Sequence, residues 1–224
     1  MNDIAPTTKD VYLVRPYFER KLREMQRDVL RMGALVELSC WLACRSLFER
    51  DLAAAQQISS NEKQIDAFYR QIEVDCIDLI GLQAPVAQDL RFLSALMQLI
   101  RDLERIGDYA EDLGEIAIEL FPYPDHDCLP QVQIMANRCR AMLAMSLAAL
   151  SNLDSHLGLD LKKQDDLVDD DYDRIYRALV GEKSTATEVE PVVLLVLSIR
   201  CLERMADHAT NIGRRVAYVV TGKR

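Results

Sequence analysis

The chain has 224 residues, half of them hydrophobic, so it is long enough to bury a core in one large domain or two small ones. Its eight glycines and seven prolines are few for this length, which favours long helices over a turn-rich all-β fold. The net charge of -9 argues against nucleic acid as the main partner. The N-terminus does not have the pattern of a signal peptide, and the longest apolar run is too short to cross a bilayer. We therefore expect a cytoplasmic protein with buried, unpaired cysteines.

Two helices with the same apolar seam open the two halves of the chain. Pro16 suits the first turn of a helix that follows a loose N-terminal arm. From Leu22 to Leu47, apolar and small residues recur every three or four positions, which is typical of a helix packed along its length. The same seam runs from Val132 to Leu150, displaced by 103 residues. The methionines lie in register with the seam, so core packing explains them better than a soft-metal groove does.

A second and a third helix follow in each half. Asp51 and Asp154 suit the N-cap positions of the second helices, and Gly81 and Gly181 suit their C-termini. Ser59–Asn61 could interrupt the second helix of the first half. The second half has no such residues at the matching place, so we predict that the helix is continuous through Ser59–Asn61. The third helix is predicted to begin at Pro85 in the first half and at the capping-box sequence of residues 187–190 in the second half.

The third helices carry the clearest repeat. Arg101–Gly114 reads RDLERIGDYAEDLG and Arg200–Gly213 reads RCLERMADHATNIG, with seven of fourteen positions identical. Self-similarity at a fixed period indicates two copies of one supersecondary unit. The sequence thus predicts an all-α fold of two tandem, structurally similar antiparallel three-helix bundles. Their predicted boundaries are residues 1–121 and 122–224, joined through the proline-rich segment Phe121–Pro130.

Each copy of the repeat contains a column of acids spaced by four residues, which places them on one side of a helix about 6 Å apart. The second helix of each half supplies two more acids with the same spacing. When the first half is folded about residue 83, Glu62 lies opposite Glu104; when the second is folded about residue 184, Asp165 lies opposite Glu203. We predict one site per half, formed by Glu62, Asp66, Glu104, Asp108 and Asp112, and by Asp165, Asp169, Glu203, Asp207 and Asn211.

Two interpretations of these acidic clusters stay open. Carboxylates brought together repel one another, and an all-oxygen cluster suits a hard cation such as ferric iron, manganese, magnesium or calcium, with zinc also compatible. The alternative is a solvated acidic face neutralised by the neighbouring arginines, Arg101, Arg105, Arg200 and Arg204. The histidines add no ligand spacing, and we expect His208 to be a surface residue pointing away from the acids.

At this point the chain resembles the PhoU family of phosphate-signalling proteins. The resemblance rests on PVAQDLR at Pro85–Arg91, DLERIGDYAED at Asp102–Asp112 and LERMADHATN at Leu202–Asn211, together with the duplicated three-helix plan. It implies iron or zinc binding through Glu104, Asp108, Glu203 and Asp207. At the third position of the acidic column, Asp112 replaces the asparagine that the family often has there. The second half lacks the PxAxDLR segment.

The resemblance also implies a function. Members of the family are cytoplasmic and often dimeric, and restrain the phosphate-starvation response by linking a phosphate ABC transporter to a membrane sensor histidine kinase. We therefore expect a non-enzymatic negative regulator, a homodimer that meets the membrane only through its partners, the transporter ATPase and the kinase. One alternative is an accessory of another phosphate transporter. The other is a carboxylate-bridged di-metal enzyme, which the lack of a Glu-x-x-His pair and of a phosphate loop disfavours.

Overall fold

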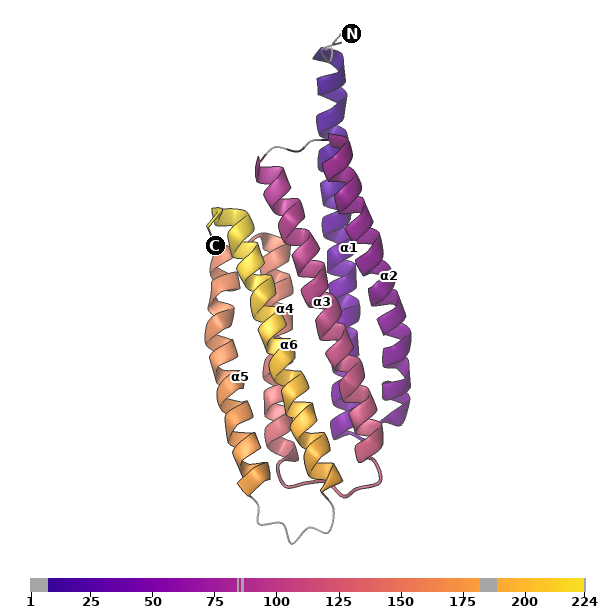
Figure 1. Ribbon diagram of the computed structural model, residues 1–224, viewed down its shortest axis with the longest axis vertical. Coiled ribbons are helices and arrows are strands. Elements are labelled where there is room, and N and C mark those ends of the chain that lie inside the picture. Colours follow the sequence, from indigo (N-terminus) through magenta and orange to yellow (C-terminus); the bar gives the residue numbers. More distant parts are fainter. Residues whose placement is uncertain (1–7, 84, 86, 182–188, 224) are drawn as a thin grey trace.

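The computed structural model describes residues 8–83, 85, 87–181 and 189–223. Within these residues the protein consists of six helices and contains no strand, as predicted. The first half contains α1 (Thr8–Phe48), α2 (Leu52–Gln83) and α3 (Ala87–Leu120), and the second contains α4 (Leu129–Asn152), α5 (Ser155–Gly181) and α6 (Glu190–Thr221) (Figure 1).

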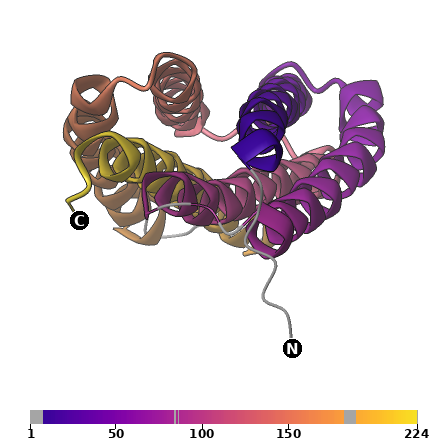
Figure 2. The ribbon, with the colours of Figure 1, turned by 90° about the horizontal axis from the view of Figure 1, so that it is seen from above.

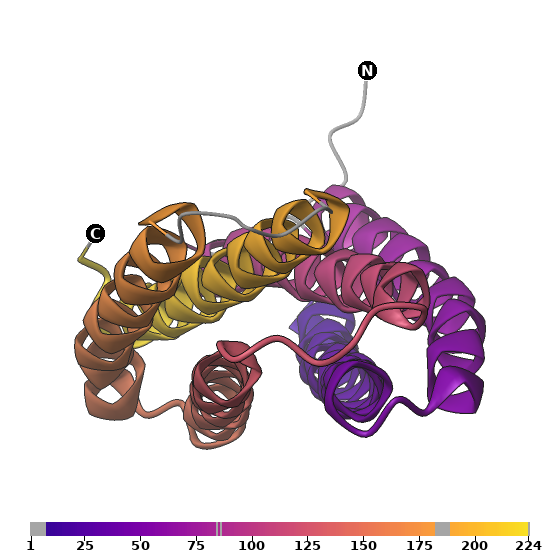
Figure 3. The same ribbon diagram turned by 90° about the horizontal axis from the view of Figure 1, so that it is seen from below.

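The two halves pack side by side as three-helix bundles. Helices α3 and α6 cross at the centre of one layer, α1 and α4 lie beside each other in the other layer, and α2 and α5 form the outer edges (Figures 2 and 3). The halves touch through α3 with α6 and through α1 with α4, whereas α2 and α5 contact helices of their own half only. The acids of α2 and α5 therefore lie on helices outside the interface between the halves, whereas α3 and α6, which carry the acidic columns, also form that interface.

One hydrophobic core runs through both halves, and the predicted seams form part of it. Along α1 the seam is buried at Met25, Val29, Met32, Val36, Ser39, Ala43 and Leu47. Along α4 it is buried at Val132, Met135, Cys139, Met142, Ser146 and Leu150. The core role predicted for these methionines is confirmed. The six cysteines are free thiols, and five of them are buried.

Small residues let the second and third helices of each half approach closely. A Cβ atom added to Gly158 of α5 would lie 2.5 Å from the carbonyl oxygen of Gly213 on α6, and one added to Gly213 would lie 2.4 Å from the oxygen of Gly158. In the first half, the matching residues are Ala55 on α2 and Gly114 on α3, which also face each other. The repeat therefore keeps a small-residue contact at the same place in both bundles, and the backbones approach more closely in the second half than in the first.

The helix boundaries confirm some of the predicted signals and correct others. The Asp51 carboxylate accepts a hydrogen bond from the N–H of residue 54 at 3.1 Å, and the Asp154 carboxylate accepts from the N–H groups of residues 156 and 157, so both cap helices as predicted. Gly81 is not a C-cap, because α2 continues through residue 83. Pro16 does not open α1, which begins at Thr8, so the helix tolerates the loss of one backbone hydrogen bond.

The remaining predicted signals lie at or near element ends. Gly181 is the last residue of α5, and Pro85 stands two residues before α3. Residue 187, the predicted N-cap of the last helix, lies outside the described residues, and α6 begins at Glu190 with Pro191 in its first turn. Between Phe121 and Cys128 the chain crosses from one half to the other, and α4 starts with Leu129 and Pro130.

Candidate functional site

The α2–α3 contact places the acids of the first half at the same height. The hydroxyl of Ser59 donates a hydrogen bond of 2.7 Å to the carboxylate of Glu111, and Ile65 packs beside Gly107, 3.2 Å from a Cβ added there. In this register Glu111 and Asp108 are the acids of α3 that act on Glu62, and Glu104 lies farther along α3. The contact is centred nearer residue 85 than residue 83, because α2 extends past Gly81. Glu62 is therefore displaced from Glu104 by about one turn, and its charge still raises the pKa of Glu104.

The acids of the first half influence one another across the two helices. Burial raises the pKa of Glu62, and the negative charges of Asp66, Glu111 and Asp108 raise it further. Burial likewise raises the pKa of Glu104, where Arg105 opposes the effect and Asp66 adds to it. The most affected group is Asp108, whose pKa burial and the neighbouring Glu104 raise to about 6 against the opposing charge of Arg105.

Arginines neutralise part of this first cluster. Arg105 lies 3.1 Å from Asp108 and 3.6 Å from Glu104, so a single guanidinium bridges two rungs of the column. On the other helix, Arg70 lies 3.1 Å from Asp66. Asp112, the third acid of the column, has an exposed side chain, but neighbouring atoms shield its carboxyl group partly from water. This partial desolvation raises its pKa, and the charge of the adjacent Glu111 raises it further.

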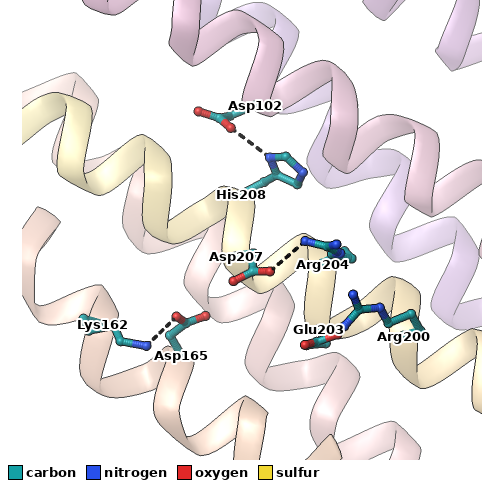
Figure 4. Close-up of polar contacts among 8 residues, drawn as sticks. All are labelled: Asp102, Lys162, Asp165, Arg200, Glu203, Arg204, Asp207 and His208. Carbon is teal, nitrogen blue, oxygen red and sulfur yellow. Dashed lines mark hydrogen bonds and ion pairs between the residues drawn. The ribbon is translucent and has the colours of Figure 1, made fainter.

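The second cluster, on α5 and α6, is arranged in the same way (Figure 4). Arg200 pairs with Glu203, and Arg204 lies 3.5 Å from Asp207. Burial raises the pKa of Asp169, and Asp165 is the next largest cause, with Asp207 and Glu203 contributing from α6. The two acids of α5 and the two of α6 thus share one electrostatic environment, and half-buried Asn211 follows one turn beyond Asp207.

Asp165 differs from its counterpart Glu62 because it is buried, with 4% of its surface exposed. One carboxylate oxygen lies 3.0 Å from the ammonium of Lys162, and the other is buried with no hydrogen-bond partner. Lys162 also lies 2.9 Å from Asp166, and these two carboxylates raise the pKa of its ammonium group. A positive charge therefore already stands beside the buried carboxylate of the second cluster.

The donor chemistry of both clusters fits a hard cation, since every candidate ligand offers oxygen and Asp165 keeps an unpartnered buried oxygen. The arrangement fits less well. Among the residues that the structure describes, no three aspartates, glutamates, cysteines or histidines are grouped closely enough to hold one metal ion. Five of the carboxylates are paired with cationic side chains: Glu104 and Asp108 with Arg105, Asp165 with Lys162, Glu203 with Arg200, and Asp207 with Arg204.

The prediction of a surface role for His208 is wrong. Its Nδ1 lies 2.8 Å from the carboxylate of buried Asp102 on α3, and its ring lies 5.9 Å from the ring of Tyr109 (Figure 4). The contact joins the two halves across the α3–α6 interface. His208 does point away from the acidic column of α6, as expected.

Sequence reasoning missed two further participants. Glu111 faces α2 more closely than Asp112 does, although only the residues spaced by four had been singled out. Lys162 stands inside the second cluster, and its place one turn before Asp165 and Asp166 is the sequence signal that could have found it.

Comparison with known proteins identifies the repeated unit. The sequence profile of the PhoU domain matches residues 29–117 and again residues 132–216. The chain belongs to the PhoU family. The matched regions contain the α2–α3 and α5–α6 acidic clusters, so each copy of the PhoU domain carries one of them.

Relatives and solved structures cover nearly the whole PhoU chain. A phosphate-specific transport system accessory protein PhoU homolog from Synechocystis sp. is 55% identical over 94% of this chain and 94% of its own length. The crystal structure of PhoU from Pseudomonas aeruginosa superposes with a TM-score of 0.89 at 30% identity, covering 92% of this chain and 100% of that one. A phosphate transport system regulatory protein PhoU from Streptococcus pneumoniae gives a TM-score of 0.85 at 26% identity, covering 92% and 98%.

The structure also explains a PhoU motif that the second half lacks. Arg91, the last residue of PVAQDLR, lies against Gly222, which caps the C-terminus of α6 in the left-handed conformation with φ 71°. A Cβ atom on Gly222 would lie 1.9 Å from the guanidinium of Arg91. The cation therefore sits at the negative end of the α6 dipole, and the motif ties the first half to the second.

Proposed function

We propose that this PhoU protein is a non-enzymatic negative regulator of phosphate uptake and of the phosphate-starvation two-component response. The observation that carries the proposal is the family match in both halves, together with relatives named as accessory or regulatory proteins of phosphate transport systems. In this proposal the protein couples a phosphate ABC transporter to a sensor histidine kinase. It acts in the cytoplasm as a homodimer, and serving a different phosphate transporter is the alternative.

The side-chain arrangement favours a regulator over a carboxylate-bridged di-metal enzyme. Such enzymes complete their sites with imidazole ligands from the same helices. Here the imidazole nearest the second cluster in sequence, that of His208, contacts Asp102 and Tyr109 on α3 instead of Glu203 and Asp207. The acids of α6 pair with arginines, which supports a role in charge balance and docking.

Docking through outer faces is the mode of action that we propose. The outer surfaces of α2 and α5 make no contact with the opposite half, so they are available to a transporter ATPase and a kinase. Among the described residues no helix is long and apolar enough to cross a membrane. In this proposal the protein reaches the membrane face through these partners without inserting.

We further propose that the two clusters take up iron, zinc or another divalent or trivalent cation in competition with the side chains that neutralise them. Glu62, Asp66, Glu104, Asp108 and Asp112 would hold the cation in the first half, and Asp165, Asp169, Glu203, Asp207 and Asn211 in the second. The bound ion would supply positive charge that rigidifies the faces beside it. A cation must displace Arg105 or Lys162, which predicts weaker binding than in a preformed site.

Metal content can be measured directly. Elemental analysis of protein purified without chelator should find bound metal, and the paired substitution Glu104→Ala with Asp108→Ala should remove the share held by the first cluster. Reloading with ferrous, ferric, manganese or zinc salts, followed by desalting, controls for loss during purification. No retained metal after reloading would leave the arginine-neutralised acidic face as the interpretation.

Genetics tests the regulatory role. Deletion of the gene should leave phosphate-starvation genes expressed in phosphate-rich medium, and the intact gene supplied in trans should silence them. The Glu104→Ala, Asp108→Ala variant should fold and silence them only partly, whereas Glu37→Gln, an exposed change on α1 outside both clusters and outside the proposed docking helices, should silence them fully. Unchanged expression in the deletion strain, with neither the ATPase nor the kinase recovered in pull-downs, would refute the proposal.

A further inference from the structure

The outer side of α1 carries a straight line of arginines followed by apolar residues. Four exposed arginines succeed one another at intervals of three and four residues: Arg20, Arg23, Arg27 and Arg31. The same line continues through one small and two large exposed residues: Ala34, Leu38 and Trp41. This spacing places all seven on one side of the helix, along about 30 Å, and together they form the α1 stripe. In the end-on views no other helix of the described residues lies over this side of α1 (Figures 2 and 3).

The acids of α1 do not cancel the charge of the stripe. The last arginine of the four is paired at 2.8 Å with an acid one turn earlier. The first, Arg20, lies 3.8 Å from Glu24, which Lys21 already holds at 3.0 Å. Among the described residues, no acid lies within ion-pair distance of Arg23 or Arg27, and the Nε of Arg27 donates a hydrogen bond to the backbone carbonyl of Arg23. Two guanidinium charges therefore stand free at the middle of the arginine run.

The duplicated helix of the second half shows that packing does not require these residues. Displaced by 103 residues, the matching exposed positions of α4 are neutral and mostly small: Pro130, Ile134, Asn137, Ala141 and Ala144. They occupy the place of the stripe from Arg27 to Trp41. Because the same place in the fold accepts neutral residues, the arginines and the tryptophan of α1 need another explanation than the core.

The layer of α1 and α4 is positive in an otherwise acidic protein. These two helices contain ten lysines and arginines and five acids, all five of them on α1, whereas the whole chain has a net charge of -9. The acidic columns lie on α3 and α6 in the other layer, about one helix diameter or 10 Å farther back. Salt screens charges over about 8–10 Å. An anionic surface placed against α1 therefore meets the arginines directly and is little affected by the acids behind them.

The residues beside the arginines favour a lipid surface as the occupant. Trp41 is 40% exposed, and the guanidinium of Arg45 lies 4.8 Å from the centre of its ring. Leu38 on α1 and Ile134 on α4 are 43% and 52% exposed. Arginines next to tryptophan and aliphatic side chains on one helix side are typical of helices that lie in the headgroup region of a membrane. A second copy of this chain fits less well, since α4 offers no acid to the arginines.

We propose that the outer side of α1 and α4 binds an anionic lipid surface, with the arginines of the α1 stripe on phospholipid phosphates and Leu38, Trp41 and Ile134 at headgroup level. Both helices lie parallel to the membrane, and none crosses it. Two free charges give weak and reversible binding, so the contact orients a protein that its partners hold at the membrane. The proposal goes beyond docking through α2 and α5 and does not depend on which transporter or kinase is served.

Co-sedimentation of the full chain with vesicles tests the contact. One set of vesicles contains equal parts of phosphatidylglycerol and phosphatidylcholine, and the control set contains phosphatidylcholine only. In low salt we expect the protein to bind the anionic vesicles at least about tenfold more tightly than the control vesicles. Added salt should release it, because the attraction is electrostatic.

Trp41 reports which side of the protein is bound, because it is the single tryptophan of the chain and belongs to the stripe. On anionic vesicles its fluorescence emission should shift to shorter wavelength, and brominated phosphatidylglycerol should quench it. Soluble polyglutamate is the probe for an acidic protein surface. At the same concentration of negative charge, it should bind at least about tenfold more weakly than the vesicles.

A matched pair of double variants locates the binding. Arg23→Gln with Arg27→Gln removes the two free charges and should weaken vesicle binding by about tenfold or more, since each arginine at an anionic membrane contributes about fivefold. Arg177→Gln with Arg214→Gln removes the same charge from exposed positions on α5 and α6 and should change binding by less than about twofold. Circular dichroism checks that both variants keep the wild-type helix content.

Five results would overturn the proposal. The first two are no binding to anionic vesicles in low salt and an equal loss of binding in the two double variants. The third is binding without a change in Trp41 emission, which would place the contact on another side. The fourth is tighter binding of polyglutamate, which would assign the face to an acidic protein. The fifth is a dimer that dissociates in the Arg23→Gln, Arg27→Gln variant, which would assign it to a second copy of this chain. Each result leaves the genetic test of the regulatory function unaffected.

Discussion

Three influences act on the carboxyl group of Asp108. Burial between α2 and α3 disfavours its charged form, Glu104 one turn earlier repels it, and Arg105 attracts it. Burial and repulsion prevail, so its pKa lies at about 6 in the folded protein compared with 3.8 ordinarily. A group with a raised pKa holds its proton more tightly in the folded state than in the unfolded chain. Folding stability therefore falls as the pH rises from about 4 to about 6, and the loss is complete above that window.

Asp108→Asn removes this ionisation. In chelator-treated protein we expect the variant to be more stable than the wild type at pH 8 by about 1 kcal/mol, a value reduced from the full shift because the side chain is partly exposed. The gain should disappear below about pH 4, where the wild-type carboxyl is also neutral. Urea unfolding at both pH values measures it. Asp160→Asn, whose carboxyl pKa is lowered by Lys163, is the control and should show no gain at pH 8.

The contact between His208 and Asp102 links the two halves and can be tested by substitution. His208→Ala leaves a buried carboxylate without its partner, which should cost about 1–3 kcal/mol in the free energy of unfolding. If the pair acts as a unit, adding Asp102→Ala should cost much less than Asp102→Ala does in the wild type. Urea unfolding of the two single variants and the double variant completes the cycle. Strictly additive costs would show that the contact contributes nothing to joining the halves.

At the scale of elements, replacing a helical glycine with alanine should change the stability of the protein in opposite directions at two positions. Gly213→Ala forces a methyl group onto the backbone of α5 at Gly158, which should cost about 1–3 kcal/mol. Gly81 lies inside α2 with nothing within 4 Å of an added Cβ, so Gly81→Ala should stabilise by about 0.5–1 kcal/mol. Chemical denaturation at neutral pH measures both. Equal effects at the two sites would mean that the α5–α6 approach is looser than the structure shows.

How far the sequence predicted these elements depends on whether the signal is local. The repeats predicted the six helices and their division into two bundles, and Asp51 and Asp154 predicted where two helices begin. Both predictions rest on amphipathic periodicity and capping, which depend only on neighbouring residues. The α2–α3 register was off by about one turn because Gly81 reads as a helix end, yet α2 continues past it. The partner of His208 lies 106 residues away in the other half. Only the packing of one bundle on the other brings it there.

On the scale of the molecule, duplication accounts for the symmetry and divergence accounts for the differences between the halves. Both bundles keep a small-residue contact, an acidic column and an arginine beside each column. They differ where the halves must recognise each other. Arg91 reaches the end of α6, whereas the matching residue, Glu190, accepts a hydrogen bond from Tyr123 at the opposite end of the molecule. Interdomain contacts thus use residues that the repeat does not conserve within this chain.

The continuous core predicts that the two PhoU domains unfold together. Trp41, the single tryptophan, stands on α1 of the first half and reports that half by fluorescence, whereas far-ultraviolet circular dichroism reports the helices of both. Because α3 packs on α6 and α1 on α4 around shared buried residues, the two signals should give the same urea midpoint.

The Gly213→Ala variant sharpens this test, because its damage lies wholly in the second half, between α5 and α6. If the halves form one cooperative unit, the Trp41 midpoint should fall by as much as the circular dichroism midpoint. A Trp41 transition that stays at its wild-type position while the helical signal unfolds in two steps would show that each PhoU domain unfolds by itself. The α3–α6 and α1–α4 contacts would then be a docking interface between independent units.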